Sequence, residues 1–444
     1  MEFVLLYALG VIIVFVGLLV SIALHEVGHL VPAKLFGVRV GQYMVGFGKT
    51  LFSRTVRGTE YGVKALPLGG YISMAGMFPP AAPGAKPRAS STGFLQVLAQ
   101  DAREQSAESI PVGEDKAAFY QLAFWKRIII MAGGPAMNLV LAFVLMAVVL
   151  CGFGVAVNTN TVSAVSECVI AVSSERQECT ADDPLAPAAE AGIRAGDTIV
   201  AIDGVQIDSW NEVQAAIQER ADRPTVFAIE RDGTVQDVTV TPMATERYAT
   251  DEANAVIRGD DGLPVTETVG FIGISPLAIT EQQPITAVGP AVWDVVERVG
   301  NVILNLPQRL VDIAVAAFGP GERDPEGPMS VVGVGRLAGE IVSLDTMPVA
   351  ERASTLMGML ASLNVALFVF NLIPLMPLDG GHILGAVLDA IRRGFAKIRG
   401  KKDPGHLDTA KWVPVTLVVT LLLGAMSLLL IYADIVKPVS LLGE

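Results

Sequence analysis

The residues best suited to do chemistry lie in the motif HEVGH, residues 25–29. A spacing of four residues places His25 and His29 on one face of a helix, where both can bind a single metal ion. Glu26 then lies beside the metal and can take a proton from a bound water. The motif follows an apolar run, residues 3–24, which exceeds the roughly 20 residues that cross a bilayer. Ionisable groups at membrane depth are costly and usually functional, so hydrolysis within a membrane is the first hypothesis.

A hydrolytic zinc site normally has three protein ligands and one water, so two histidines leave it incomplete. The only other histidines are His382 and His406, and His406 lies in a basic stretch where it is expected to be solvated. Asp379, in the run NLIPLMPLDGGH at residues 371–382, is the favoured third ligand. The prolines of this run break a helix, and its glycines let the backbone turn sharply. His382 remains an alternative ligand, and an ordinary carboxylate in a helix-terminal turn is the alternative role for Asp379.

The elements that must position these residues are apolar segments. With 52% hydrophobic residues, the chain is neither an ordinary soluble globule nor a disordered chain. Four segments are apolar over about a bilayer's width: 3–24, 128–149, 356–375 and 413–431. The first could instead be the core of a signal peptide. Against that, it has no basic residues before it and no small-residue cleavage site before the histidine motif.

The distribution of charge predicts the topology. Lysines and arginines are frequent in residues 31–127 and 392–402, whereas residues 154–350 contain no lysine and are acidic. By the positive-inside rule the two basic stretches are cytoplasmic, so the acidic stretch and both termini lie outside. The net charge of −13 argues against nucleic acid as a partner.

The acidic stretch contains one module, residues 158–276, that resembles a circularly permuted PDZ domain of bacterial envelope proteases. The predicted elements are strands at 198–202, 226–231 and 235–241 and a short helix at 210–220. PDZ domains bind extended peptide ends at a sheet edge, which implies recognition or exclusion of a substrate. An inert β spacer is the alternative.

Cys168 and Cys179 fall in the same exterior stretch, where a disulfide could persist, and two free thiols are the alternative. Farther along the chain, apolar residues recur at helical spacing over residues 287–318, but charges interrupt them. This pattern predicts one or two amphipathic helices on the membrane surface or packed on the core. Near the N-terminus, glycines and alternating side chains in residues 37–48 and 61–74 indicate β-hairpin pieces.

Taken together, the histidine motif, the Leu-Asp-Gly at 378–380, the run GPAMN at 134–138 and the PDZ-like segment resemble the site-2 protease family of intramembrane zinc metalloproteases. Within it, the chain is similar to the bacterial group of regulator of sigma-E proteases. The resemblance implies Zn²⁺ held by His25, His29 and Asp379, with Glu26 as the catalytic carboxylate.

The resemblance also implies how a substrate is held. Asn371 would contact the substrate backbone, and Gly69, Gly70 and Tyr71 belong to a membrane-associated β-loop that pairs with an unwound substrate as an added strand. Asn138 is left open between a helix-packing contact with Gly134 and a catalytic role.

The expected fold is an α-helical polytopic membrane protein with four transmembrane helices, a cytoplasmic membrane-associated β-loop and an extracytoplasmic PDZ (β-rich α+β) domain. The expected segments are 1–30 (first span), 31–77 (β-loop region), 78–126 (flexible cytoplasmic insert), 127–153 (second span), 158–276 (PDZ), 285–349 (amphipathic helices), 353–381 (third span), 382–412 (basic loop) and 413–435 (fourth span).

The expected function is cleavage of transmembrane segments in pre-cleaved membrane proteins, such as anti-sigma factors or signal-peptide remnants, in regulated intramembrane proteolysis. The protein would be a multi-pass plasma-membrane zinc metalloendopeptidase with its active site toward the cytoplasm. Its partners would be transmembrane substrates, the lipid bilayer and peptide or substrate ends at the PDZ domain. Two rival functions are a membrane-anchored protease with a cytosolic site and a PDZ adaptor with a vestigial metal site.

Overall fold

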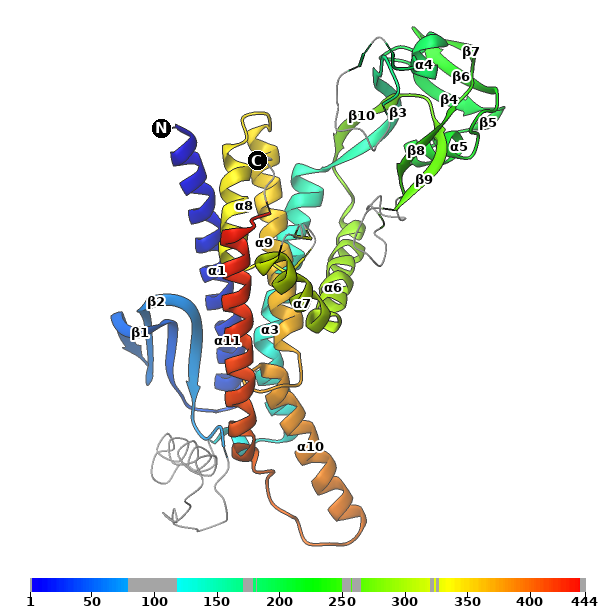
Figure 1. The fold of residues 1–444 in the computed structure, drawn as a ribbon. Coiled ribbons are helices and arrows are strands. Elements are labelled where there is room, and N and C mark those ends of the chain that lie inside the picture. The colour runs from blue at the N-terminus through cyan, green and yellow to red at the C-terminus, as the bar shows by residue number, and fades with distance from the viewer. Residues whose placement is uncertain are drawn as a thin grey trace. The chain divides into compact units, whose positions relative to one another are not determined.

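The computed structural model describes residues 2–78, 118–170, 179–180, 182–249, 257, 265–319, 323–324 and 327–439. The chain forms two compact units, one made of residues 1–153 and 284–444 and the other of residues 154–283 (Figure 1). Most of the insert expected at residues 78–126 lies outside the described residues. Each unit is described by itself.

In the described part of the first unit, four helices are long and apolar enough to cross a membrane, and the sequence predicted four spans. They are α1 (Glu2–Leu35), α3 (Phe124–Ala147, extended by the π-helical η3, Val148–Phe153), α9 (Val349–Asn371) and α11 (Val413–Val436). Large apolar side chains such as Leu5, Val144 and Leu421 are more than half exposed on them. Such faces suit a lipid solvent, because a helix satisfies its own backbone hydrogen bonds there.

Glycines set how closely the helices approach one another. A Cβ atom added to Gly28 of α1 would lie 2.2 Å from the carbonyl oxygen of Gly133 in α3. One added to Gly10 of α1 would lie 2.2 Å from the carbonyl oxygen of Ala338. Helices in a membrane associate largely through such close packing at small residues. The helix that carries the histidine motif is therefore fixed against its neighbours at both ends.

The segment 382–412, expected as a basic loop, is instead helical over its first half. Helix α10 runs from Asp379 to Ile398, and the 3₁₀ turn η5 (Thr409–Trp412) precedes α11. The missed signal was the apolar spacing of Leu388, Ile391, Phe395 and Ile398, which repeats every three or four residues as on one face of a helix. The break between α9 and α10 contains Pro374 and Pro377, as the sequence predicted.

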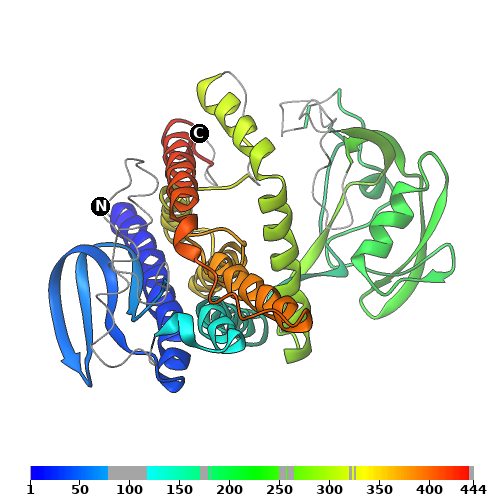
Figure 2. The ribbon, with the colours of Figure 1, turned by 90° about the horizontal axis from the view of Figure 1, so that it is seen from below.

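The β-loop region forms a small sheet of two long strands, β1 (Val40–Val56) and β2 (Thr59–Met74). Both strands bend, so residues 40–45 of β1 pair with residues 60–63 of β2 on one side and with 70–74 on the other. The stretch 70–74 is thus an edge of this sheet. In Figure 2 the sheet lies beside α1, on the side of that helix away from α10.

Three further helices complete the described part of the first unit. The amphipathic pattern at 287–318 appears as α6 (Val288–Leu304) and α7 (Leu306–Phe318). Helix α8 (Val331–Ser343) falls in the segment 285–349 expected to form amphipathic helices, and Ser330 caps it: its Oγ accepts from the N–H groups of Val332 and Gly333. Short 3₁₀ turns, η2 (Phe119–Gln121) and η4 (Ile285–Ala287), lead into α3 and α6.

The second unit has a β-sheet in the order β10-β3-β4-β6-β7, with β5 paired to β4, and a separate ribbon β8-β9. Its strands are β3 (Val155–Val165), β4 (Thr198–Ile202), β5 (Val205–Gln206), β6 (Thr225–Arg231), β7 (Thr234–Val240), β8 (Met243–Tyr248), β9 (Thr266–Phe271) and β10 (Ile274–Glu281). Its helices are α4 (Pro187–Glu190) and α5 (Trp210–Gln218). The strands and the helix predicted between residues 198 and 241 all form within two residues of their expected limits. Trp210, Val213 and Phe227 are among the buried side chains of its own core.

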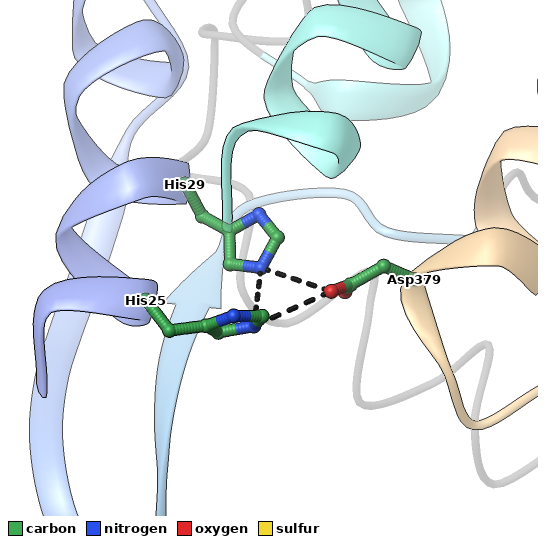
Figure 3. A group of neighbouring side chains, drawn as sticks. All are labelled: His25, His29 and Asp379. Atoms are coloured by element: carbon green, nitrogen blue, oxygen red, sulfur yellow. Dashed lines mark hydrogen bonds and ion pairs between the residues drawn. The ribbon is translucent and has the colours of Figure 1, made fainter. Parts of the chain in front are cut away.

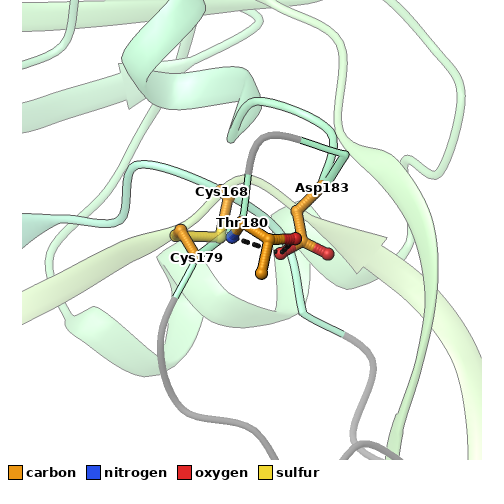
Figure 4. Close-up of a disulfide and its surroundings, with 4 residues drawn as sticks. All are labelled: Cys168, Cys179, Thr180 and Asp183. Atoms are coloured by element: carbon orange, nitrogen blue, oxygen red, sulfur yellow. Dashed lines mark hydrogen bonds between the residues drawn. A yellow bond between two sulfur atoms is a disulfide. The ribbon is translucent and has the colours of Figure 1, made fainter.

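Cys168 and Cys179 form a disulfide in this unit (Figure 4). Beside it, the N–H and the Oγ1 of Thr180 both donate to the carboxylate of Asp183, at 2.7 and 2.8 Å. The third cysteine, Cys151, is free.

Asp197 is the main buried charge of the second unit and generates a stability prediction. Only 1% of Asp197 is exposed, and its carboxylate accepts two hydrogen bonds from Arg231, at 2.6 and 2.7 Å, and one from the Arg194 amide. The Arg231 guanidinium and the amide lower the pKa of Asp197. We expect Asp197→Asn to destabilise the unit by about 1–3 kcal/mol, measured as faster hydrogen exchange of β4 and β6 amides in the full chain.

The pH dependence follows from the direction of the shift. A lowered pKa in the folded state means that this stabilisation is complete above the unfolded value, about 3.9, and is lost as the pH falls through the folded value. Asp237→Asn, an exposed change on β7, is the matched control. Equal exchange in both variants would show that the Asp197 pair contributes nothing.

Candidate metal centre

Three side chains from two distant segments converge at the C-terminal half of α1 (Figure 3). The Nε2 atoms of His25 and His29 each lie 3.3 Å from Oδ2 of Asp379. The two Nε2 atoms are 3.1 Å apart. The helical spacing of four supplies the histidine pair, and the turn between α9 and α10 supplies the carboxylate as the first residue of α10.

This triangle fits a zinc ion. Ligand atoms about 2.0–2.1 Å from zinc in a tetrahedral site are about 3.3 Å from one another, close to the three distances here. Two imidazole nitrogens and one carboxylate oxygen are a common ligand set for catalytic zinc, which keeps a fourth position for water. Among the described residues, Oδ2 of Asp379 has no hydrogen-bond donor although it is buried. A buried carboxylate oxygen without a donor is costly unless a cation satisfies it.

The neighbouring helix α3 orients this site. Nδ1 of His29 lies 2.7 Å from the carbonyl oxygen of Ile130, a contact that directs the opposite nitrogen toward Asp379. Gly134, one turn farther along α3, leaves room for the rings: a Cβ there would lie 2.2 Å from Nε2 of His29 and 2.7 Å from Nε2 of His25. Only a residue without a side chain can occupy that position next to the histidines.

Glu26 is close to the same centre and to the edge of the β-sheet. It is 9% exposed, and it follows His25 directly on α1. A Cβ added to Gly70 of β2 would lie 3.0 Å from Cγ of Glu26 and 3.2 Å from Cγ2 of Ile22. The absence of a side chain at Gly70 therefore lets the edge stretch 70–74 run directly alongside the glutamate.

Other residues singled out in the sequence have their own contacts. The Tyr71 hydroxyl donates to Oε1 of Gln42, and the Tyr71 ring stacks on Phe47. Asn371 donates to the carbonyl oxygen of Leu367 in its own helix. His406 lies 3.4 Å from Asp389, and His382 is not part of the group of three.

Asn138 is fully buried in α3, and neither its Oδ1 nor its Nδ2 has a partner among the described residues. In the GPAMN run, Gly134 is the residue that lies against both histidine rings.

Sequence reasoning missed one polar contact between the two helices that bring the site together. Asn364 of α9 is fully buried and donates from Nδ2 to Oγ of Ser21 on α1, at 2.9 Å. Ser21 lies one turn before His25. The signal was an asparagine inside an apolar segment, which in a membrane helix indicates a polar contact between helices or a functional role.

The structure thus defines a class: a membrane protein whose apolar helices carry a hydrolytic zinc site. Comparison with known proteins agrees. Residues 13–402 match the model of peptidase family M50. The zinc metalloprotease Rip1 of Mycolicibacterium smegmatis is 33% identical over 452 residues, which cover 98% of this chain and 99% of the relative. Rip1 of Mycobacterium tuberculosis is 33% identical over 446 residues with the same coverage, and metalloprotease MmpA of Caulobacter vibrioides is 28% identical over 399 residues, 87% of this chain and 88% of the relative.

The chain belongs to peptidase family M50, the site-2 protease family. It is a zinc metalloprotease of the membrane, and zinc is its metal.

The geometry predicts which residue completes the metal site. We expect Asp379→Ala to weaken zinc binding by more than the roughly 10–100-fold that is typical of changes behind the ligands, because a ligand is lost outright. Zinc per purified chain, measured by elemental analysis during titration with a chelator, checks this.

His382→Ala is the matched control, since His382 is three residues away and outside the triangle. Full zinc in Asp379→Ala together with zinc loss in His382→Ala would reverse the assignment.

Proposed function

We propose that this protease cleaves peptide bonds within transmembrane segments of membrane proteins that an earlier cleavage has shortened. The supporting observation is the position of the triangle: His25 and His29 lie on α1, a candidate span, and Asp379 follows the turn after α9, another candidate span. Anti-sigma factors and signal-peptide remnants have the required chemistry, which is a single apolar helix left in the bilayer. The setting would be regulated intramembrane proteolysis.

In this proposal His25, His29 and Asp379 hold the zinc, which when bound supplies a water of lowered pKa and polarises a carbonyl. The Glu26 carboxylate takes a proton from the attacking water and later delivers it to the leaving amine. The carbonyl of Ile130 keeps the His29 ring oriented. Gly134 keeps space free beside both rings.

A substrate helix must unwind before it is cut, because an intact helix satisfies its own backbone groups. We propose that the edge stretch 70–74 of β2 pairs with the unwound substrate, with Gly69, Gly70 and Tyr71 at its start. Main-chain hydrogen bonds to an edge strand suit an extended peptide of any sequence. The proximity of Gly70 to Glu26 would then bring the paired segment to the catalytic carboxylate. Asn371, next to the turn that carries Asp379, would bind the substrate backbone.

We also propose a topology and a role for the second unit. The lysine-free composition of residues 154–350 and the basic character of 392–402 support an extracytoplasmic position for the former and a cytoplasmic one for the latter. The second unit would then be a PDZ domain that meets peptide or substrate ends outside the cell and filters substrates by the size of their exterior part. It would not take part in the chemistry.

The catalytic role of Glu26 has a direct test. We expect Glu26→Gln to keep its zinc but to cleave a model transmembrane substrate about 10²–10⁴-fold more slowly, because general-base catalysis is lost while the ligands remain. Cleavage in detergent is followed by mass spectrometry of the products.

The control is Glu219→Gln, an exposed change in the second unit, which should cleave normally. Near-normal turnover by Glu26→Gln would remove this glutamate from the mechanism, and loss of its zinc would make it a ligand instead.

The topology is tested with the disulfide. After mild reduction of intact cells, a membrane-impermeant thiol reagent should label Cys168 and Cys179, because both lie in the extracytoplasmic unit. A Cys151→Ser background removes the remaining thiol. Labelling that appears only after the membrane is disrupted would invert the proposed orientation.

A further inference from the structure

A cavity of about 690 Å³ lies between the start of α3 and the C-terminal half of α10. Its lining includes Trp125 and Arg127 from α3 and Arg393, Lys397 and Lys401 from α10 and the turn after it. It is separate from the metal centre, and none of its lining residues has a role in the proposed chemistry.

The cavity carries a net positive charge. Four cationic side chains line it against two carboxylates, Asp389 and Asp403. Arg127 pairs with Asp389 at 2.6 Å, and Arg393 pairs with Asp403 at 2.7 Å. Lys397 and Lys401 have no ion pair within the described part of the chain. Two positive charges are therefore left over for an anion.

The start of α3 favours an anion at the same place. Its N-cap is Ala123, which offers no side-chain acceptor, and its first turn contains no acidic residue. Lys126 and Arg127 lie there instead, although a helix N-terminus attracts negative charge. Arg127 is only 8% exposed; its guanidinium pairs with Asp389, but its buried Nε has no acceptor among the described residues. A buried donor without an acceptor is costly, so a further acceptor beside this guanidinium would be stabilising.

The surroundings of this cavity are of the kind found at the depth of lipid headgroups. Phe124 and Trp125 are each 47% exposed at the start of a candidate span, and aromatic residues collect at membrane interfaces. The apolar stripe of α10 is also exposed, at Ile391, Phe395 and Ile398 among others, while its other side is basic. A basic amphipathic helix of this kind lies in the interface of a bilayer.

We propose that the cavity between α3 and α10 binds the phosphate headgroup of an anionic phospholipid. Lys397 and Lys401 would bind the phosphate oxygens, and Nε of Arg127 and the first amides of α3 would donate to them. The acyl chains would run along Trp125 and the apolar stripe of α10. The proposal does not depend on the cleavage chemistry, because no metal ligand or catalytic residue takes part.

The test uses the full zinc-loaded chain in a neutral detergent. Binding of fluorescent phosphatidylglycerol is compared with binding of fluorescent phosphatidylcholine, which has the same acyl chains and no net charge. We expect phosphatidylglycerol to bind at least about tenfold more tightly. We expect the double variant Lys397→Gln/Lys401→Gln to lose about tenfold to thirtyfold of that affinity while its binding of phosphatidylcholine stays unchanged.

The matched control is Arg399→Gln/Lys402→Gln, which removes the same charge from exposed positions of the same segment that do not line the cavity. This control should bind phosphatidylglycerol like the unaltered chain. Equal losses in the two double variants would reduce the effect to general attraction by a basic segment and overturn the proposal.

Two further outcomes would also overturn it. One is equal affinity for the two lipids. The other is complete displacement of phosphatidylglycerol by millimolar inorganic phosphate but not by chloride at the same ionic strength. The site would then recognise free phosphate and not a lipid. Because zinc content and cleavage are measured on the same samples, failure of the lipid proposal is separable from failure of the proposed protease function.

Discussion

The structure depends on one constraint: a histidine pair and a glutamate on an apolar helix must be held together with an aspartate from the turn that follows another apolar helix. Charged groups in such surroundings are costly unless they are paired or coordinate a metal. The triangle of His25, His29 and Asp379 meets this requirement with separations that suit zinc. The elements around the triangle hold its three residues and Glu26 in their relative positions.

Close packing at small residues fixes the positions of these helices. Gly28 against Gly133 joins α1 to α3 just beside the histidines, and Gly134 gives the rings their space. The hydrogen bond from Asn364 to Ser21 links α1 to α9, the helix that precedes Asp379. In lipid, helices gain little from hydrophobic association with one another, so contacts of these two kinds carry the arrangement. A change of one methyl group at Gly134 would press directly on the ligands.

The edge of the small β-sheet, the residues of the triangle and the second unit are separate elements of the fold. The edge stretch 70–74 lies near Glu26 of α1, whereas His25, His29 and Asp379 come from helices. The proposed substrate pairing and the proposed metal binding therefore depend on different elements of the first unit. The second unit has its own buried core and its own ion pair, Asp197 with Arg231, and none of the three residues of the triangle belongs to it.

The sequence by itself determined the features that depend on local spacing. Four apolar segments predicted the four candidate spans, and a spacing of four placed His25 and His29 on one face. Alternation with glycines predicted the β-hairpin pieces of β1 and β2, and the PDZ-like pattern predicted β4, β6 and β7. It also favoured Asp379, but through resemblance and depth, because 350 residues of chain separate it from His29. Local patterns failed at α10, where the many basic residues led the sequence analysis to expect a loop although apolar residues recur at helical spacing.

Only the tertiary structure decided which helices meet and at what distance. Three contacts result from packing between segments far apart in sequence. Gly134 lies against the histidines, Gly70 lies beside Glu26, and Asn364 donates a hydrogen bond to Ser21. The same holds for the cationic cavity, whose walls come from α3 and α10. Periodicity tells which face of a helix is buried, but the partner of that face depends on the shapes of all the neighbours at once.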